Sequence, residues 1–346
     1  NTKSSATVNS CQFKAGHSQS QGGAILVNSG KLSIFDSLFE DNSSVGSGGA
    51  IEAINSVLEV RRSVFTECTS DSEMGGCIFL TMSELEISSC ELSGTNSGAL
   101  IGFSSALKVM NSTFSSNSGI SGGAIYCQSC SALSIDSSSF ISNSASSGGA
   151  IKIDGSTGQQ LNAVISSCDF EGNSANEYGG AVAVQNVNLE VFSCTFAHSS
   201  ALLEDGGAIY LRCPSEDCKF SLKDCSFLNN TALSEGGAVS WKHSEPTFEG
   251  MSFQDNKADY GDDIASFPID FILETNVPAK VQSYMQSVVS GNLIESAIRG
   301  SLIDHYNNPV KTDEQSSVEL YALEPSKVSI LGNNRAKVSR GSFEIE

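Results

Sequence analysis

The sequence predicts an all-β protein, with a parallel β-helix of about ten coils in residues 1–266 and an immunoglobulin-like β-sandwich in residues 280–346. Three observations support this prediction. Two short motifs recur together about every 26 residues, apolar residues alternate with polar ones between the motifs, and the repeats stop near Ile264. A fixed period of roughly 20–50 residues is typical of solenoids, in which each repeat buries its apolar face only against its neighbours.

The first motif is a phenylalanine followed three residues later by an asparagine. Leu92 takes the place of the phenylalanine in one repeat. Because the repeats stack, we expect the phenylalanines to form a column inside the β-helix and the asparagines to form a hydrogen-bonded column at a bend. The expected columns contain Phe13, Phe39, Phe65, Phe114, Phe140, Phe170, Phe196, Phe227 and Phe253, and Asn42, Asn117, Asn143, Asn173, Asn230 and Asn256.

The second motif, Gly-Gly-Ala-Ile, follows the first after roughly eight to ten residues, from residues 22–25 to residues 236–239, and decays at residues 261–264. A glycine pair permits a turn with positive φ or a close approach of two backbones. Between the motifs, pairs such as Leu58 and Val60 alternate with polar residues at the period of a strand. The surrounding Ser, Asn and Gly residues favour tight bends. Each repeat is therefore predicted to contain three short strands.

Together these motifs resemble the repeats of the polymorphic outer membrane proteins of chlamydiae, which are also similar to repeats in large surface proteins of ciliates and other protists. The resemblance covers about residues 1–266, and Leu92, Cys68, Cys77 and Ser199 depart from the pattern. It implies a right-handed β-helix that is displayed outside the cell for adhesion or surface architecture. The motif is specific for the repeat, but it implies no particular ligand.

The composition excludes several classes of function. The chain has 39 acidic and 19 basic residues and a formal net charge of −20, which disfavours nucleic acid as a partner. We expect a solvated, self-repelling surface. No run of 18 apolar residues is present, so no membrane span is predicted. Because the chain begins inside a repeat and without Met, we expect a mature fragment or an internal piece of a larger protein.

Eleven cysteines divide into groups by their position in the repeat. Cys127 and Cys130, and likewise Cys213 and Cys218, follow a Gly-Gly-Ala-Ile-Tyr sequence and lie at the same bend of two different coils. We predict a local disulfide in each pair, as in oxidising compartments. The alternative for Cys127-x-x-Cys130, half a zinc site or a redox motif, needs partners or a βαβ context that the chain lacks.

The other cysteines are assigned by register. Five of them lie two residues before the phenylalanine position, so they are expected to point inward in a buried column that they share with serines: Cys11, Cys90, Cys168, Cys194 and Cys225. Cys68 and Cys77 are candidates for closing a third loop within one coil. The pairing of these seven cysteines stays open, and the odd total leaves at least one free or intermolecular thiol.

Three Asn-x-Ser/Thr sequences are candidate glycosylation sites, at Asn42, Asn111 and Asn229. Asn42 belongs to the asparagine column, where we expect its amide to be bonded within the stack. Asn111 and Asn229 are expected to point outward, because they lie out of phase with the inward-facing residues. Covalent glycans are therefore expected on the outer surface.

A different pattern begins after the repeats. Residues 267–279 are predicted to be a linker, and residues 280–346 contain alternating apolar runs around a turn at residues 304–309. This pattern favours the immunoglobulin-like sandwich, although the segment is short for a complete one. Residues 300–313 are similar to the strand-turn-strand of bacterial immunoglobulin-like and filamin-like modules.

No catalytic, cofactor-binding or metal-binding residue is predicted. Pectate lyases and polygalacturonases are also parallel β-helices, but their sites need clustered carboxylates with a basic residue on the same face. The adjacent carboxylates Asp262 and Asp263 lie in the last coil and are interpreted as a polar cap. Arg61-Arg62 has no acidic cluster beside it in the sequence, and the four histidines lie far apart in register: His17, His198, His243 and His305.

We therefore predict an extracellular or cell-surface protein with a structural or adhesive role and no enzymatic activity. Its rod is expected to associate with itself or with other surface proteins, and end-to-end assembly would give a glycosylated fibre. An alternative is a glycan-binding adhesin, which would use aromatic residues beside the glycine column: Tyr126, Tyr178, Tyr210, Trp241 and Tyr260. Trp241 either stacks on a sugar or covers the last coils. A polysaccharide-cleaving enzyme of the pectate lyase type is the less favoured alternative.

Overall fold

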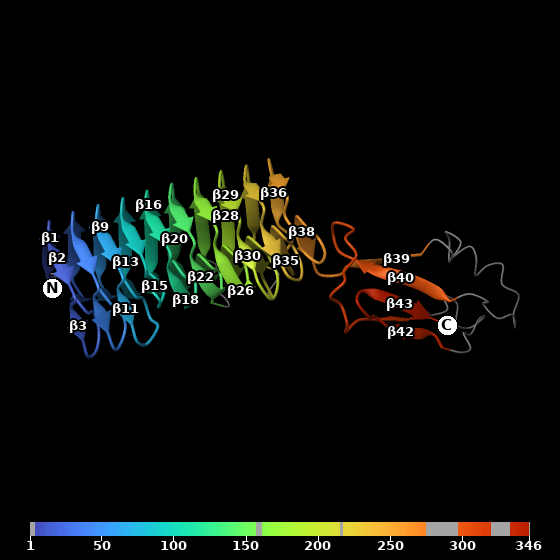
Figure 1. Cartoon of the computed structure of the whole chain (residues 1–346), viewed down its shortest axis with the longest axis horizontal. Helices are drawn as coiled ribbons and strands as arrows, with labels where there is room; N and C mark the ends of the chain where they lie inside the picture. Colours follow the sequence, from blue (N-terminus) through green and yellow to red (C-terminus); the bar gives the residue numbers. More distant parts are fainter. Residues whose placement is uncertain (1–3, 157–160, 215–216, 275–296, 320–332, 346) are drawn as a thin grey trace, which may run out of the picture.

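The computed structural model describes residues 4–156, 161–214, 217–274, 297–319 and 333–345. These residues form strands, turns and bends (Figure 1). No helix capable of crossing a membrane occurs in this described part of the chain. The predicted all-β class is confirmed. A parallel β-solenoid extends to Ser266, and small antiparallel sheets follow it.

Three parallel sheets of ten strands each form the solenoid. Sheet 1 contains β1 (Ser5–Asn9), β5 (Lys31–Phe35), β9 (Val57–Arg61), β13 (Glu84–Ser88), β16 (Ala106–Met110), β20 (Ala132–Asp136), β24 (Asn162–Ser166), β28 (Asn188–Phe192), β32 (Phe220–Lys223) and β36 (Thr247–Glu249). Sheet 2 contains β2 (Gln12–Lys14), β6 (Leu38–Glu40), β10 (Val64–Thr66), β14 (Glu91–Ser93), β17 (Thr113–Ser115), β21 (Ser139–Ile141), β25 (Asp169–Glu171), β29 (Thr195–Ala197), β33 (Ser226–Leu228) and β37 (Ser252–Gln254).

Sheet 3 carries the Gly-Gly-Ala-Ile motifs at the starts of its strands. It contains β4 (Ile25–Asn28), β8 (Ile51–Ile54), β12 (Ile78–Thr81), β15 (Leu100–Phe103), β19 (Ile125–Gln128), β23 (Ile151–Asp154), β27 (Val182–Gln185), β31 (Ile209–Arg212), β35 (Val239–Lys242) and β38 (Ile264–Ser266). Two shorter sheets lie between sheets 2 and 3 along the chain. They contain β3 (His17–Ser18), β7 (Ser43–Ser44) and β11 (Thr69–Ser70), and β18 (Ser118–Ser121), β22 (Ser144–Ser147), β26 (Ser174–Tyr178), β30 (Ser200–Ala201) and β34 (Thr231–Ala232).

We number the coils 1 to 10 by their residue in the phenylalanine column, from Phe13 in coil 1 to Phe253 in coil 10. Equivalent residues of successive coils are paired in register, as Leu32 is with Leu58 and Leu58 is with Leu85. The predicted phenylalanine column is confirmed. Neighbouring rings stack with centroids 4.5–5.3 Å apart, and Leu92 fills the gap between Phe65 and Phe114.

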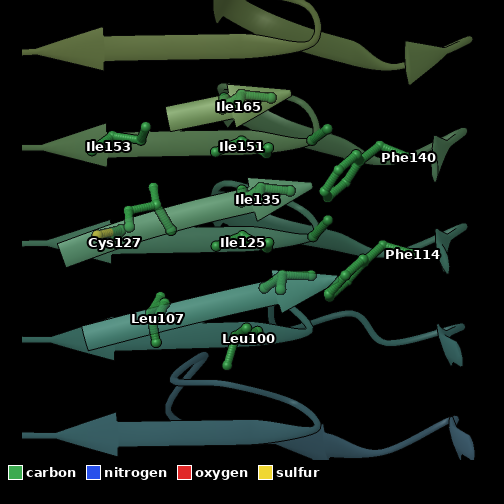
Figure 2. Close-up of a cluster of buried hydrophobic side chains, with 14 of the residues drawn as sticks. Leu100, Leu107, Phe114, Ile125, Cys127, Ile135, Phe140, Ile151, Ile153 and Ile165 are labelled. Atoms are coloured by element: carbon green, nitrogen blue, oxygen red, sulfur yellow. The ribbon is translucent and has the colours of Figure 1, made fainter. Parts of the chain in front are cut away.

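Aliphatic side chains complete the core beside this column (Figure 2). Ile125 and Ile151 of sheet 3 and Ile135 of sheet 1 are fully buried next to Phe114 and Phe140. The side chains alternate between the core and the outside because the strand period is two. The apolar pairs found in the sequence are therefore the inward-facing residues of sheet 1.

The predicted asparagine column is also confirmed. In coils 5 to 7, the Asn117 backbone N–H donates to Asn143 Oδ1 at 3.1 Å, and the Asn143 N–H donates to Asn173 Oδ1 at 3.0 Å. Each amide also donates to the carbonyl of a phenylalanine-column residue one coil earlier, as Asn143 Nδ2 does to Phe114 O at 3.0 Å. The column thus satisfies buried backbone groups at a bend where strand pairing stops.

Two further polar columns lie at the other bends, and each follows a residue with a left-handed backbone. In coil 2, Asp36 has a φ of 50°, and the next residue, Ser37, accepts a hydrogen bond from the Cys11 N–H one coil earlier at 3.1 Å. Ser56 does the same for the Gly30 N–H at 3.2 Å. The second of these columns was not anticipated. A serine directly before several strands of sheet 1, as at Ser56, Ser83 and Ser105, was its signal in the sequence.

The glycine pairs serve two different purposes. Gly148 has a φ of 62°, a left-handed conformation that favours glycine. At Gly149, a Cβ would lie 2.1 Å from the carbonyl oxygen of Gly180 in the next coil, so no side chain fits between the two backbones. The first glycine therefore permits the turn, and the second permits the close stacking of coils.

The described C-terminal residues form two small antiparallel sheets. These sheets do not by themselves confirm the predicted immunoglobulin-like sandwich. One contains β39 (Asp270–Leu273), β40 (Ile298–Ile303) and β43 (Ser342–Ile345), and the other contains β41 (Ser317–Glu319) and β42 (Arg335–Lys337). Strand β39 lies in the predicted linker, residues 267–279. Its alternating Phe271 and Leu273 allow it to pair with β40, so the C-terminal sheet begins earlier than the predicted boundary.

The predicted turn at residues 304–309 lies against the last coil. Buried Asp304 accepts hydrogen bonds from the backbone N–H groups of Ser266, Tyr306 and Asn308 at 2.8–3.1 Å. The Asn308 side chain donates to the Ile264 carbonyl at 2.9 Å. Because these bonds reach the last strand of sheet 3, the turn closes this part of the solenoid.

Candidate functional site

A group of buried ionisable side chains lies on the outer side of sheet 3 in coils 8 to 10. Lys242 at the end of β35 makes ion pairs with Asp205 Oδ2 at 2.9 Å and with Glu235 Oε1 at 3.3 Å. Asp205 and Glu235 each precede a glycine pair and are both 3% exposed. We call these three residues with Ser240 and Tyr260 the charged cluster.

Hydrogen bonds hold the charged cluster in place. Ser240 donates to Glu235 Oε1 at 2.9 Å, and the Tyr260 hydroxyl donates to Glu235 Oε2. Burial raises the pKa of Glu235, and the nearby Asp205 carboxylate adds to that shift. Burial opposes the charge of Lys242, but the Glu235 and Asp205 carboxylates raise its pKa overall. Lys242 therefore stays charged and compensates the buried carboxylates.

This arrangement suits a structural role better than acid–base catalysis. A catalytic carboxylate must come within hydrogen-bond reach of its substrate. Both carboxylates of the charged cluster are almost completely covered, and their oxygens are engaged by Lys242, Ser240 and Tyr260. Sequence reasoning missed the cluster because its members come from three different repeats. The acidic residues directly before the glycine pairs of coils 8 and 9 were the available signal.

The aromatic residues of the glycan-binding hypothesis do not form an exposed row. Tyr210, Trp241 and Tyr260 are buried, and burial raises the pKa of Tyr210 to about 12. Tyr178 is partly exposed and stacks on Tyr210 with ring centroids 4.6 Å apart. Trp241 is 1% exposed and donates to the Tyr306 hydroxyl at 2.9 Å. Of the two predicted roles of Trp241, the structure supports covering of the last coils.

Two of the histidines come together around the same aromatic group, contrary to the prediction that all four lie far apart. His243 and His305 both pack on Phe267, with ring centroids 6.1 and 6.3 Å from it. The sequence could not show this, because His305 reaches coil 9 only through the C-terminal turn. His198 instead contacts exposed Glu171 at 2.9 Å.

An open cleft of about 630 Å³ lies between the last coil and the C-terminal turn. Its walls include Tyr306 and Lys311 from the C-terminal residues, together with Asp262 and Asp263 from coil 10. Asp262 Oδ1 accepts from the Ala258 N–H, and Asp263 Oδ1 accepts from Asn256 Nδ2, each at 3.0 Å. These bonds fit the predicted polar cap, since Asp263 ends the asparagine column.

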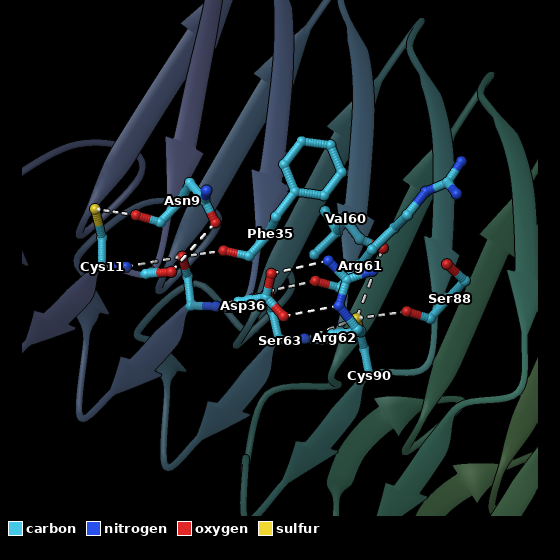
Figure 3. A network of polar contacts seen from close by, with 12 residues as sticks. Asn9, Cys11, Phe35, Asp36, Val60, Arg61, Arg62, Ser63, Ser88 and Cys90 are labelled. Carbon is cyan, nitrogen blue, oxygen red and sulfur yellow. Dashed lines mark hydrogen bonds and ion pairs between the residues drawn. The ribbon is translucent and has the colours of Figure 1, made fainter.

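The paired arginines do have carboxylates beside them, contrary to the sequence interpretation (Figure 3). Arg62 binds both carboxylate oxygens of Asp36 at 2.7 and 2.8 Å, and this contact lowers the pKa of Asp36. Arg61 pairs with Glu59 and, one coil later, with Glu86 at 3.3 Å. Stacking brings residues 26 positions apart side by side, which a search for sequence neighbours does not detect.

The candidate glycosylation sites differ in accessibility. Asn111 and Asn229 are exposed at bends, with φ values of 47° and 52°, so their side chains are accessible for a covalent glycan. Asn42 is 0% exposed, and its Nδ2 donates to the Phe13 carbonyl at 2.9 Å. The candidate site at Asn42 is therefore corrected, because the nitrogen that would carry the glycan is buried and bonded in the asparagine column.

Both predicted disulfides are present. The Cα atoms are 5.8 Å apart in the Cys127–Cys130 pair and 6.0 Å apart in the Cys213–Cys218 pair, within the usual range. The candidate third loop between Cys68 and Cys77 has no bond in this structure, where both are buried thiols. The cysteine column is buried at Cys90, Cys168, Cys194 and Cys225, whereas Cys11 is exposed. Cys11 departs from the prediction because it lies in coil 1, where no earlier described coil covers it.

No group of three or more potential His, Cys, Asp or Glu metal ligands occurs in the described residues. The described residues form a regular β-solenoid with ion pairs on its surface and a disulfide at two of its bends. A family model described as a right-handed beta helix region matches residues 1–162 and 97–276. The chain therefore belongs to the right-handed β-helix family. No curated protein and no solved structure matches the chain.

Proposed function

We propose that this chain is an extracellular structural or adhesive protein of a cell surface, with a right-handed β-helical rod that carries glycans at Asn111 and Asn229. The observation that carries the proposal is the continuous stack of ten coils with a disulfide at two of its bends. A solenoid provides a long, rigid face for contacts, and disulfides persist mainly in oxidising compartments. Both finer assignments, to the chlamydial outer membrane protein type of repeat and to an immunoglobulin-like C-terminal sandwich, are part of this proposal.

The proposal requires no catalytic step. Two of the carboxylates that an enzyme could use are held in ion pairs, Asp36 with Arg62 and Asp205 with Lys242. Many of the remaining charges are acidic and exposed, which favours a soluble surface that resists unspecific association. Binding would then depend on a partner that matches a long repetitive face rather than a pocket.

Self-association is the partner interaction we favour. Inward-facing residues of coil 1, Val8, Phe13 and Ile25, are only half-buried, whereas their equivalents in coil 2 are almost fully covered. A further coil, from the same chain or from another copy, would cover these side chains and pair with the strand edges. Analytical ultracentrifugation and electron microscopy of the purified chain test this interaction. Fibres support end-to-end assembly, and a monomer at all concentrations contradicts it.

Surface labelling of native cells tests the location. A membrane-impermeant amine reagent should label the protein on intact cells, and peptide mapping should find glycans on Asn111 and Asn229 but not on Asn42. Labelling only after lysis would refute the extracellular role. Beads coated with the chain should adhere to cells or matrix, whereas release of oligosaccharides from polysaccharides by the chain would favour the enzymatic alternative.

A further inference from the structure

Coil 3 differs from the other coils at two positions at once. Cys68 stands where most coils have the asparagine of the column, and Cys77 stands where the Gly-Gly-Ala-Ile motif has alanine. Neither position is a cysteine in any other repeat of the sequence. Two independent replacements by cysteine within one coil suggest that the two positions act together.

These two positions face each other in the fold. In coil 10 the equivalent residues are Asn256 and Asp263, whose side chains are joined by a hydrogen bond of 3.0 Å. In coil 3, a Cβ on Gly76 would lie 2.7 Å from the Cys68 carbonyl oxygen, so the backbone leading into Cys77 runs directly beside Cys68. Both cysteine side chains are 0% exposed.

The two thiols also interact with each other. Contact with Cys77 lowers the pKa of Cys68, and the same contact raises the pKa of Cys77. Asn42 Nδ2 approaches the Cys68 sulfur from the preceding coil at 3.9 Å. The two thiols therefore lie close enough to influence each other's ionisation, and the thiolate is the form that attacks a disulfide.

We propose that Cys68 and Cys77 form a third disulfide in the mature protein. This inference rests on the proposed extracellular function, because it needs an oxidising compartment. The Cys68 thiolate attacks the disulfide of an exchange partner, either a protein disulfide or oxidised glutathione, and forms a mixed disulfide. The Cys77 thiolate then displaces the partner, so the two cysteines lose two protons and two electrons while the partner is reduced to two thiols.

The location gives the bond a structural purpose. Coils 3 and 4 lack the column asparagine, with Cys68 and Thr95 in its place, and coil 4 also lacks the phenylalanine. A disulfide would link the start and the end of the bend at this interruption. Since both sulfurs are buried, the bond would form before the coil closes and would afterwards be protected from reductants.

The other stacked thiols are a natural control within the same chain. Cys168, Cys194 and Cys225 also lie next to each other, on successive coils. Each of these thiols donates to the carbonyl two residues earlier, as Cys68 does to Thr66 at 3.5 Å, so that bond does not separate the two groups. The difference is their spacing: they lie in register on successive coils, so their Cβ atoms are about 4.8 Å apart, which is more than the usual distance across a disulfide. We expect these three to remain thiols.

Differential alkylation of the full secreted chain tests the inference. The protein is denatured without reductant, labelled with iodoacetamide, digested and analysed by mass spectrometry. We expect a linked peptide pair containing Cys68 and Cys77, two hydrogens lighter than the separate peptides, and labelled Cys168, Cys194 and Cys225. A Cys77→Ala variant should expose Cys68 to the label, and because alanine is the residue of the other coils, this variant should still fold.

The outcomes separate this inference from the proposed function. Label on Cys68 and Cys77, with Cys127–Cys130 and Cys213–Cys218 still linked, overturns the third disulfide and leaves the extracellular role intact. Label on all six cysteines in protein from its natural source overturns both. A linked Cys68–Cys194 peptide, or any link within the cysteine column, also contradicts the pairing proposed here.

Discussion

Coils 5 to 7 and coils 3 to 4 have the same strand register but different side-chain columns. In coils 5 to 7, the rings of Phe114, Phe140 and Phe170 stack with interplanar angles of 8–9°, beside an unbroken asparagine column. In coils 3 to 4, Phe65 pairs with Leu92, and no asparagine column is present. The coils nevertheless remain paired. The backbone ladder and aliphatic core therefore suffice for the fold, and the columns add local stability to it.

The largest difference is expected for truncation of the phenylalanine column. Phe140→Ala should lower the free energy of unfolding by about 3–5 kcal/mol, because it leaves a cavity in the core. It also removes two stacked ring pairs, which are worth roughly 0.5–1.5 kcal/mol each. Leu92→Ala is the matched variant in the interrupted coils and should cost less, about 2–3 kcal/mol. Urea denaturation measures both, and an equal or larger loss for Leu92→Ala would contradict the ranking.

A second comparison separates the two roles of glycine. Gly149→Ala should destabilise the solenoid by about 3 kcal/mol, because its Cβ would meet the Gly180 carbonyl at 2.1 Å. Gly172→Ala is the control. Gly172 has a φ of 63°, but a Cβ there has 3.6 Å to its nearest neighbour, so only the backbone cost of about 1–2 kcal/mol applies. Similar thermal unfolding midpoints for the two variants would show that close stacking is not what requires the second glycine.

The asparagine column gives a third comparison. Asn143→Ala removes the acceptor of the Asn117 N–H and the donor to the Phe114 carbonyl, both of which are buried. We expect a loss of about 2–3 kcal/mol in unfolding free energy. Thr95→Ala in coil 4 removes a bond from the Ser97 N–H at 3.3 Å and should cost about 1 kcal/mol. Hydrogen exchange should show the protection lost at Asn117 in the first variant, and unchanged protection there would argue against a backbone-satisfying role.

The outer side of sheet 3 carries a buried glutamate near each end of the solenoid, and the two glutamates have different partners. Glu235 in coil 9 has Lys242 beside it, whereas Glu52 in coil 2 is 1% exposed and accepts only from Ser47, at 2.6 Å. Burial raises the pKa of Glu52, although the Ser47 hydrogen bond opposes the shift. A raised pKa stabilises the fold below the unfolded value of 4.5, and this contribution is lost as the pH rises through the folded value. Glu52→Gln should therefore flatten the decline of stability above pH 4.5 relative to the unsubstituted chain.

The pH comparison needs a variant at a glutamate that has a cation nearby. Glu235 bonds Ser240 as Glu52 bonds Ser47, with the two positions exchanged. Glu235→Gln serves this purpose, because Lys242 would lose one of its two ion pairs. The pKa of Glu235 is raised too, but Glu235→Gln would leave the Lys242 ammonium with one of its two carboxylate partners. We therefore expect Glu235→Gln to lower stability near neutral pH, while Glu52→Gln raises it. Chemical denaturation across the acid range measures both, and parallel pH profiles for the two variants would show that Lys242 has no influence.

The sequence predicted those parts of the fold in which identical side chains recur. Phe140 and Asn143 were assigned correctly because most coils place the same residue type at the same position. The charged cluster was missed, since Asp205, Glu235 and Lys242 are unlike residues brought together only by stacking. The C-terminal sheet boundary was misplaced because β39 has no repeat to align with. Sequence periodicity thus reveals columns of like residues, but not contacts between unlike ones.

The smallest expected effect is also the most informative about the interrupted coils. Leu92→Phe would complete the phenylalanine column, since Leu92 pairs in register with Phe65 and Phe114. Two new ring pairs are worth roughly 0.5–1.5 kcal/mol each, while insertion into a packed core costs roughly 1–3 kcal/mol. Because the column holds a phenylalanine in the nine other coils, we expect the packing cost to be low and the variant to gain about 1 kcal/mol. A loss of stability in urea denaturation would instead show that the shorter coil 4 narrows the interior, so that leucine is the residue that this coil requires.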